Sequence, residues 1–208
     1  MNFSFLPLFA SPVMKVQLDL DLEKLTEFSF ETRNKNKKGA QVSNKGGWQS
    51  KNISEEKHEE FIRLKKEINQ YLQIYHSKVF QEMIFSSEVT QGIGNSWINI
   101  NEKHHYNEWH NHPGGNLSGA YYIKHDGSSE NGNIIFRHPN HLYMITSHWP
   151  ENIIKTPNIV SSEIVNTTPK SNTLLIFPSW LEHKVEANLK DNIRISLSFN
   201  SDILKEVC

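Results

Sequence analysis

The spacing of apolar residues divides the chain into a helical first part and a second part of short strands. Over residues 54–76, apolar side chains recur every three or four positions, as on one face of a helix. The residues on this face are Phe61, Leu64, Ile68, Leu72 and either Ile74 or Tyr75. Ser54 is expected to cap this helix, which should end near His76. From residue 96 onward, apolar and polar residues alternate in short runs separated by turns, which is typical of strands.

Further elements are predicted on both sides of this helix. Alternation over residues 13–20 predicts a strand, and Asp21 is placed to cap a helix that continues to about Lys35. The strands predicted in the second part cover residues 97–101, 117–124, 133–137, 159–167, 173–177, 184–187 and 193–199. Strands of this length and spacing favour an antiparallel sandwich or barrel. Residues 138–157 are predicted to form a long irregular segment, which is the candidate for a lid over a binding site.

The composition is that of a folded domain. A chain of 208 residues has room for a sizeable core, and its 37% hydrophobic and 11% aromatic content argues against disorder. We predict a single domain over residues 1–208, in which residues 1–95 support a β core over residues 96–200. The predicted fold class is therefore mainly β with flanking helices (α+β).

Charge and cysteine content narrow the partners and the compartment. The net charge of −1 gives no general attraction to nucleic acid or to an anionic membrane, so neither is an expected partner. Cys208 is the single cysteine, which excludes a disulfide within the chain and fits a reducing compartment. No apolar run reaches the length of a membrane span, and we expect a cytoplasmic protein.

Three histidines are candidates for a metal site. His110 and His112 lie two residues apart, and on a strand that spacing points both imidazoles to the same face. His183 follows a predicted turn and opens the next strand, so it is the candidate for a distant third ligand. Glu108, two residues before His110, would form an alternative pair with it.

Arg194 lies on a predicted strand with one polar face. It shares this face with Ser196 and Ser198, while the opposite face carries Ile195 and Leu197. If the polar face points inward, the buried guanidinium requires an anion, and its planar shape suits a carboxylate. If the face points outward, the same residues are simply solvated. The alternation alone supports both arrangements.

Several short motifs, taken in order, resemble those of one oxygenase family. They are Gly47-Trp48-Gln49-Ser50, Ser96-Trp97-Ile98-Asn99, His110-Asn111-His112-Pro113, Ser118-Gly119-Ala120-Tyr121-Tyr122 and Phe177-Pro178-Ser179-Trp180-Leu181-Glu182-His183, followed by Arg194 and Ser196. The sequence is similar to the iron(II)- and 2-oxoglutarate-dependent oxygenases of the prolyl-hydroxylase-like superfamily, and most similar to a family of them found in bacteria and bacteriophages. The resemblance implies a double-stranded β-helix (jelly roll), with the N-terminal helices packed on its major sheet.

The resemblance also implies roles for individual residues. The positions that match metal ligands are His110, His112 and His183. The positions that match residues holding the distal carboxylate of 2-oxoglutarate are Arg194, Ser196 and Tyr122, with Asn99 or Asn101 as a looser match to a cosubstrate contact. The implied activity is that of an iron(II)- and 2-oxoglutarate-dependent dioxygenase, which hydroxylates a small molecule or a protein side chain and releases succinate and carbon dioxide. Such a protein could form a homodimer.

His112 departs from the common pattern of the superfamily, which has a carboxylate at that position. With three neutral imidazoles an iron(II) ion keeps its full charge, which the 2-oxoglutarate dianion would compensate. The same three histidines also suit zinc with a water in the fourth position. They suit two other kinds of protein as well: a cupin-like metalloenzyme, such as an isomerase or a cosubstrate-independent dioxygenase, and a catalytically silent metal-binding module. A buried Arg194 would favour the oxygenase, because the cosubstrate needs a cation at its far end.

The remaining histidines and one tryptophan have plainer explanations. His104 and His105 lie in a predicted loop close to the first histidine pair. The histidines expected at the surface or in the lid are His125, His138, His141 and His148. Trp180 is expected to lie in the core.

Overall fold

The computed structural model describes residues 10–80, 89–142 and 162–205. Within these ranges the α-helices are α1 (Leu22–Lys35) and α2 (Glu59–Val79). The strands are β1 (Met14–Gln17), β2 (Asn44–Lys45), β3 (Trp48–Gln49), β4 (Val89–Asn101), β5 (Tyr106–His110), β6 (Leu117–Lys124), β7 (Ile134–Arg137), β8 (Ile164–Thr167), β9 (Thr173–Pro178), β10 (His183–Val185) and β11 (Arg194–Lys205). A short 3-10 helix, η1 (Ser129–Asn131), precedes β7.

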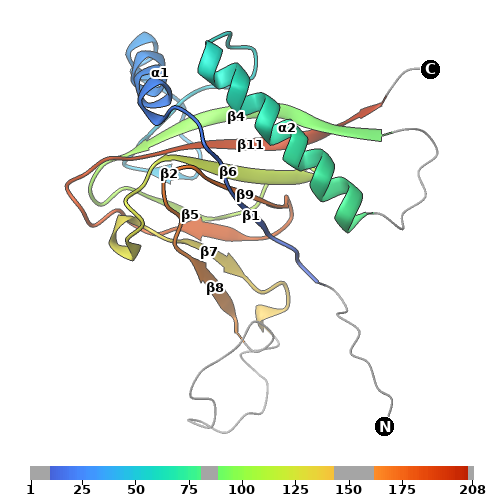
Figure 1. The fold of residues 1–208 in the computed structure, drawn as a ribbon. Helices are drawn as coiled ribbons and strands as arrows, with labels where there is room; N and C mark the ends of the chain where they lie inside the picture. Colours follow the sequence, from blue (N-terminus) through green and yellow to red (C-terminus); the bar gives the residue numbers. More distant parts are fainter. Residues whose placement is uncertain (1–9, 81–88, 143–161, 206–208) are drawn as a thin grey trace, which may run out of the picture.

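The strands form two antiparallel sheets that face each other (Figure 1). The six-stranded sheet has the order β1-β9-β6-β11-β4-β3, and the five-stranded sheet has the order β2-β5-β10-β7-β8. From β4 to β11 the chain passes repeatedly from one sheet to the other. The last of these strands, β11, lies in the middle of the larger sheet, between β6 and β4. The prediction of a mainly β, antiparallel fold with helices beside it is confirmed.

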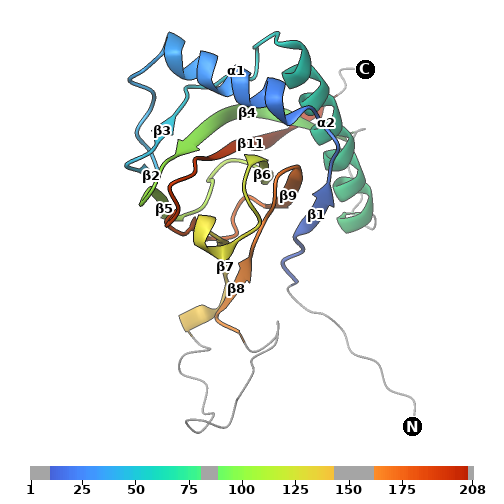
Figure 2. The ribbon, with the colours of Figure 1, turned by 60° about the vertical axis from the view of Figure 1, so that its left-hand side comes forward.

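Both helices lie along the outer face of the six-stranded sheet (Figure 1, Figure 2). The apolar face of α2 is fully buried in a core cluster that it shares with residues of the sheet such as Ile98. The helix residues concerned are Phe61, Leu64, Ile68 and Leu72. Complete burial of one such side chain stabilises a fold by about 1.5–3 kcal/mol. This packing accounts for the regular apolar spacing of the helix.

The first helix begins where the sequence predicts. Oδ1 of Asp21 accepts hydrogen bonds from the backbone N–H groups of Glu23 and Lys24, both at 3.1 Å, and α1 then runs to Lys35. A side-chain cap of this kind contributes about 1 kcal/mol. The strand predicted over residues 13–20 is shorter than expected, since β1 ends at Gln17.

The second helix does not begin at Ser54, and this prediction is wrong. Ser54 is buried in a turn, where its N–H donates to Oδ1 of Asn52 at 3.0 Å. The same oxygen accepts from the N–H of Ser96 at 3.1 Å, which ties the turn to β4. The helix therefore starts only at Glu59, and it continues to Val79 rather than ending near His76.

Alternate residues of β11 point to opposite sides of the larger sheet. Ile195 and Leu197 of β11 belong to the core cluster on the helix side. Arg194, Ser196 and Ser198 point the other way and line a pocket between the two sheets. The polar face of β11 is therefore the inner face, and Arg194 is only 2% exposed.

Several strands differ in length from the predicted ones. β4 begins at Val89 and β11 continues to Lys205, because the two strands pair along their whole length. The apolar pattern does not predict β5, which has only five residues. β8 begins at Ile164, and residues 159–161 of the strand predicted there lie outside the described residues.

The segment predicted to be a lid, residues 138–157, lies for the most part outside the described residues, and so does His148. In the part of the chain that the structure describes, no helix combines the length and the apolar character that a membrane span requires.

Candidate metal and cosubstrate site

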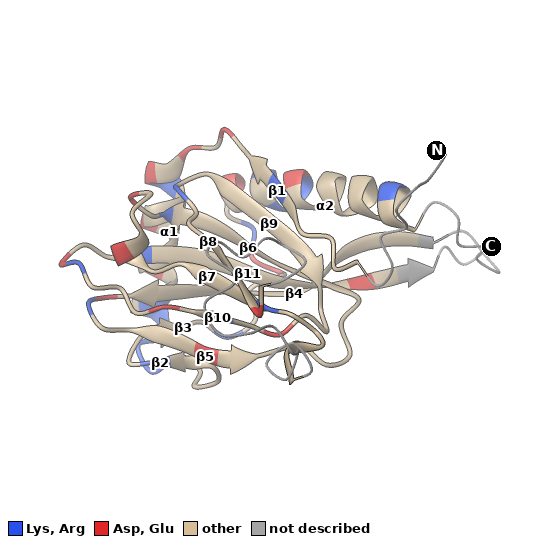
Figure 3. Cartoon of the chain, turned by 90° about the horizontal axis from the view of Figure 1, so that it is seen from below, with Lys and Arg blue, Asp and Glu red and all other residues tan. Residues whose placement is uncertain are grey.

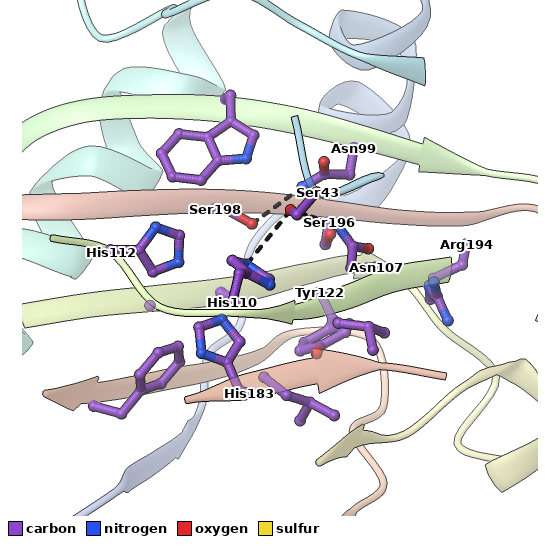
Figure 4. A pocket seen from close by; sticks show the side chains of 16 residues that line it. Ser43, Asn99, Asn107, His110, His112, Tyr122, His183, Arg194, Ser196 and Ser198 are labelled. Carbon is purple, nitrogen blue, oxygen red and sulfur yellow. Dashed lines mark hydrogen bonds between the residues drawn. The ribbon is translucent and has the colours of Figure 1, made fainter. Parts of the chain in front are cut away.

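Three histidines converge between the two sheets (Figure 4). His110 ends β5 and His183 begins β10, and the two are paired residues of neighbouring strands. His112 follows two positions after His110. One ring nitrogen from each of the three lies within 4.8 Å of the others, which is a spacing that a single metal ion can bridge. The structure therefore brings together all three histidines that the sequence singles out.

Local hydrogen bonds orient two of these rings. Nδ1 of His110 lies 2.7 Å from the backbone oxygen of Glu108, and Nδ1 of His183 lies 2.9 Å from that of Leu181. A carbonyl oxygen can only accept, so Nδ1 carries the proton in both rings and Nε2 carries the lone pair. A hydrogen bond of this kind at the second ring nitrogen is the usual way in which proteins orient a metal-binding histidine.

The three imidazoles are neutral at neutral pH. Burial lowers the pKa of His183 from 6.5 to about 3 and that of His112 to about 4, and it lowers the pKa of His110 as well. Charge on His110 would further disfavour protonation of the other two rings. Neutral imidazole is the form that binds metal, so none of the three rings has to lose a proton before it can bind an ion.

A β-bulge in β5 directs a further side chain, that of Asn107, into the site. His183 pairs with His110, but Val185 pairs with Asn107, so the register shifts by one residue between them. A bulge of this type re-aims side chains near functional sites. As a result Asn107 and His110 line the same pocket, although a spacing of three would put them on opposite faces of a regular strand. Nδ2 of Asn107 donates to Oγ of Ser43 at 3.3 Å.

Arg194 is a buried cation whose two terminal nitrogens differ in their contacts. Its Nη1 donates to the backbone oxygens of Asn131 (2.7 Å) and Glu186 (3.0 Å). Its Nη2 is buried and makes no hydrogen bond within the described residues. Burial lowers the pKa of the guanidinium to about 10, and the group still carries its charge at neutral pH. An unpaired charge in this position fits an anionic ligand that enters the pocket.

Tyr122 and Ser196 lie beside Arg194. They are paired residues of β6 and β11, and both line the pocket that contains the three histidines. Burial raises the pKa of Tyr122 to about 12, although the positive charge of Arg194 acts in the opposite direction. The hydroxyl group therefore stays protonated and can donate a hydrogen bond.

Of the two asparagines considered as cosubstrate contacts, Asn99 lines the pocket and Asn101 does not. Nδ2 of Asn101 donates to Oδ1 of Asn44 at 2.8 Å, so its amide is used in holding β2 against β4. Glu108 is also turned away from the histidines, because its carboxylate pairs with Lys45 at 3.2 Å on the exposed side of the strand. The pocket is also lined by residues for which the sequence predicts no role in the site, among them Ser43, Trp97, Asn107 and Ser198.

Two of the plainer expectations are wrong. His125 is buried rather than exposed, with Nε2 donating to the backbone oxygen of Gly132 at 3.1 Å. Trp180 is 52% exposed and does not belong to the core, because it lies in the turn between β9 and β10. His105 serves its own loop, where Nδ1 accepts from the N–H of Glu102 at 3.0 Å.

Comparison with known proteins supports one family. A family model described as "Putative 2OG-Fe(II) oxygenase" matches residues 95–200, just over half of the chain. This range contains the three histidines, Tyr122 and Arg194. A search of curated proteins by sequence gives no match.

Solved structures with a similar fold include enzymes that use 2-oxoglutarate. SnoK, a non-heme alpha ketoglutarate dependent carbocyclase from nogalamycin biosynthesis, has a TM-score of 0.62 and 13% identity, over 94% of this chain and 82% of that one. A Pseudomonas putida prolyl-4-hydroxylase has a TM-score of 0.58 and 12% identity, over 90% of this chain and 91% of that one. The viral collagen prolyl hydroxylase vCPH from Paramecium Bursaria Chlorella virus-1 has a TM-score of 0.57 and 11% identity, over 91% and 94%. At these identities the likeness is one of fold.

Proposed function

We propose a site and a reaction for this chain on the premise that it belongs to the 2OG-Fe(II) oxygenase family and is an iron(II)- and 2-oxoglutarate-dependent oxygenase. In this proposal His110, His112 and His183 bind the metal through ring nitrogens. Arg194 and Tyr122 bind the distal carboxylate of 2-oxoglutarate, with Ser196 beside them. Asn99 contacts the cosubstrate between the two ends.

The observation that carries this assignment is the buried charge of Arg194 in the same pocket as the three histidines. An ionised group without a counter-charge is costly to bury, so the pocket is built for an anion. A cupin-like enzyme without a cosubstrate, or a silent metal-binding module, would leave this charge uncompensated. A dicarboxylate that reaches from the metal to Nη2 compensates it.

The protein residues around the pocket have defined tasks in this reaction. When bound, iron(II) and 2-oxoglutarate would activate dioxygen, which is the oxidant: one oxygen atom would oxidise 2-oxoglutarate to succinate and carbon dioxide, and the other would enter the substrate. The Nδ1 hydrogen bonds of His110 and His183 leave the Nε2 lone pairs of both rings available to a metal ion. The hydroxyl group of Tyr122 donates a hydrogen bond to the distal carboxylate and keeps its proton, because its pKa is about 12. Phe177 and Ile134 line the pocket and restrict access of water.

The presence of His112 in place of a carboxylate leaves the metal with its full positive charge. One carboxylate of 2-oxoglutarate would offset part of that charge at the metal while the other pairs with Arg194, so binding of metal and of cosubstrate should be strongly coupled. We therefore propose iron(II) as the working metal. Zinc, which suits the same ligands, would occupy the site without supporting oxidation.

We further infer that the two sheets form a double-stranded β-helix. The strands β9-β6-β11-β4 would be the major sheet and β5-β10-β7-β8 the minor sheet, with α1 and α2 packed on the major sheet and residues 1–208 forming a single domain. The order of the strands and their alternation between sheets support this assignment.

The proposed substrate is a small molecule or a protein side chain, which is hydroxylated beside the metal. Trp97 lines the pocket, with its ring centre 5.7 Å from that of His112, and is the proposed contact for the substrate. Lys and Arg are interspersed with Asp and Glu over the described residues seen in Figure 3, which favours these substrates over a nucleic acid.

Release of succinate tests this function directly. Purified protein supplied with iron(II), ascorbate and 2-oxoglutarate should release succinate slowly even without a substrate. The His183→Ala protein is the control, because it lacks a proposed metal ligand. Succinate release at the level of this control, with candidate substrates also supplied, would overturn the assignment.

A further inference from the structure

The guanidinium of Arg194 is fixed through one of its two terminal nitrogens. Nη1 donates to the backbone oxygens of Asn131 and Glu186, whereas Nη2 is buried and unpartnered within the described residues. A guanidinium is planar and rigid, so two acceptors on Nη1 also fix the direction of Nη2. Figure 4 shows Arg194 at the opposite end of the pocket from His112. The residues that carry the two carbonyl groups therefore decide where Nη2 points.

Asn131 is held more firmly than an ordinary loop residue. It is fully buried at the end of η1, and its Nδ2 donates to Oδ1 of Asn188 (2.8 Å) and to Oδ1 of Asn192 (2.9 Å). Its Oδ1 accepts from the N–H of Asp126 at 3.3 Å. The side chain thus ties its own backbone to two other loop segments. Without these bonds the carbonyl group that holds Nη1 would be free to shift.

The next residue, Gly132, allows the backbone to come close to the guanidinium. Its φ is +97°, and a Cβ atom there would lie 1.9 Å from Nη1 of Arg194. The backbone oxygen of Gly132 accepts from Nε2 of His125, whose ring packs edge-on against Tyr122 with the ring centres 5.6 Å apart. One short segment therefore contacts Arg194 directly and is linked to Tyr122 through His125.

We propose that Asn131 is a positioning residue for the cosubstrate: by fixing the carbonyl group that accepts from Arg194, it aims Nη2 at the distal carboxylate of 2-oxoglutarate. This inference rests on the role given to Arg194 under the proposed function. It predicts that replacing Asn131 weakens the binding of ligands that reach Arg194. The affinity for ligands that contact only the metal should not change.

Isothermal titration calorimetry on manganese(II)-loaded protein, which binds without turnover, separates the two kinds of ligand. The probes are 2-oxoglutarate and oxalate, which chelates a metal but has no distal carboxylate. Asn131→Ala should bind 2-oxoglutarate about tenfold more weakly, as expected for loss of one well-placed hydrogen bond to a charged group. Affinities for oxalate and for manganese(II) should stay within about twofold of the wild-type values.

Two more variants separate an effect on ligand affinity from a loss of protein stability. Asn192 is exposed, so Asn192→Ala should fold normally, and it removes one acceptor of the Asn131 side chain with an expected loss of about threefold for 2-oxoglutarate. Gln91→Ala is the matched control, because Gln91 is a buried amide in β4 that does not line the pocket. It should lower the unfolding temperature and leave both ligand affinities unchanged.

The outcomes distinguish this inference from the proposed function. If the wild-type protein with manganese(II) does not bind 2-oxoglutarate, the proposed function fails. If the wild-type protein binds it and Arg194→Gln weakens binding, but Asn131→Ala and Asn192→Ala do not, the role of Asn131 is overturned. An equal loss for oxalate and 2-oxoglutarate would overturn it as well, since it would indicate a general disturbance of the pocket.

Discussion

His110 and His183 are cross-strand partners at the ends of β5 and β10, with ring centres 4.4 Å apart. Each donates from Nδ1 to the backbone oxygen of the residue two positions before it. Two distant segments of the chain therefore use the same local hydrogen bond to present Nε2 on the same side. A site built on paired strands in this way is more rigid than one built on loops.

Loss of His183 should abolish metal binding. His183→Ala removes one of three proposed ligands, and we expect an affinity loss larger than the ~10–100-fold typical when only a supporting contact of a ligand is removed. Iron(II) affinity measured by competition with a chelator checks this prediction. His105→Ala, in the loop after β4, is the control and should bind iron(II) normally. Unchanged affinity in His183→Ala would exclude it as a ligand.

Restoring a carboxylate at position 112 should weaken cosubstrate binding. His112→Asp lowers the net charge of the metal centre by one, and the attraction between the metal and the 2-oxoglutarate dianion falls accordingly. We expect iron(II) binding to persist and the dissociation constant for 2-oxoglutarate to rise about tenfold, as measured by anaerobic titration. Tighter binding of 2-oxoglutarate in this variant would contradict the charge argument.

The Arg194→Gln variant should bind 2-oxoglutarate weakly even when it is loaded with metal. Breaking a buried charge pair costs about 2 kcal/mol or more, which corresponds to about 30-fold in affinity. Saturating 2-oxoglutarate should therefore raise the unfolding temperature of the metal-loaded wild-type protein and have little effect on the variant. Gln91→Ala, at a buried amide of β4 that does not line the pocket, should keep the wild-type response. An equal thermal shift in Arg194→Gln would remove Arg194 from its assigned role.

The stability of the metal-free protein should decrease in mild acid, in part because of His125. Burial lowers the pKa of His125 below its usual 6.5, and the charge of Arg194 acts in the same direction. The unfolded chain therefore binds a proton that the folded protein resists, so the stabilisation is complete above pH 6.5 and is lost as the pH falls below it. Urea unfolding at a series of pH values checks this prediction. His125→Gln should show a shallower decline below pH 6.5, and an identical decline would rule out His125 as a contributor.

Some of the site could be predicted from the sequence because it follows regular strand geometry. The spacing of His110 and His112 and the turn before His183 are local patterns, and the structure brings these rings together. The direction of Arg194 could not be predicted, because alternation defines two faces of a strand without saying which one is covered. The second sheet covers one face of β11 and so determines which face is buried. The sequence of β11 alone does not predict this.

Other parts of the site follow from irregularities that leave no periodic signal. Asn107 reaches the pocket only because a bulge in β5 adds one residue to the register. Ser43 precedes β2, a strand of two residues, which is too short to alternate. Asn101 shares the inner face with Asn99, but Asn44 from β2 engages its amide. Trp180 is an aromatic residue in a turn, where apolar character does not imply burial.

The place of β11 in the larger sheet has a consequence for how the protein is made. Its two neighbours, β4 and β6, precede it by many residues, and β11 fills the gap between them. While a ribosome is still synthesising residues 194–205, both neighbours have a free edge and the helix-side core lacks Leu197 and Phe199. Exposed strand edges and apolar surface favour aggregation. We therefore expect these edges and this apolar surface to stay open until β11 emerges, and Arg194 arrives together with the strand that fills the gap between β4 and β6.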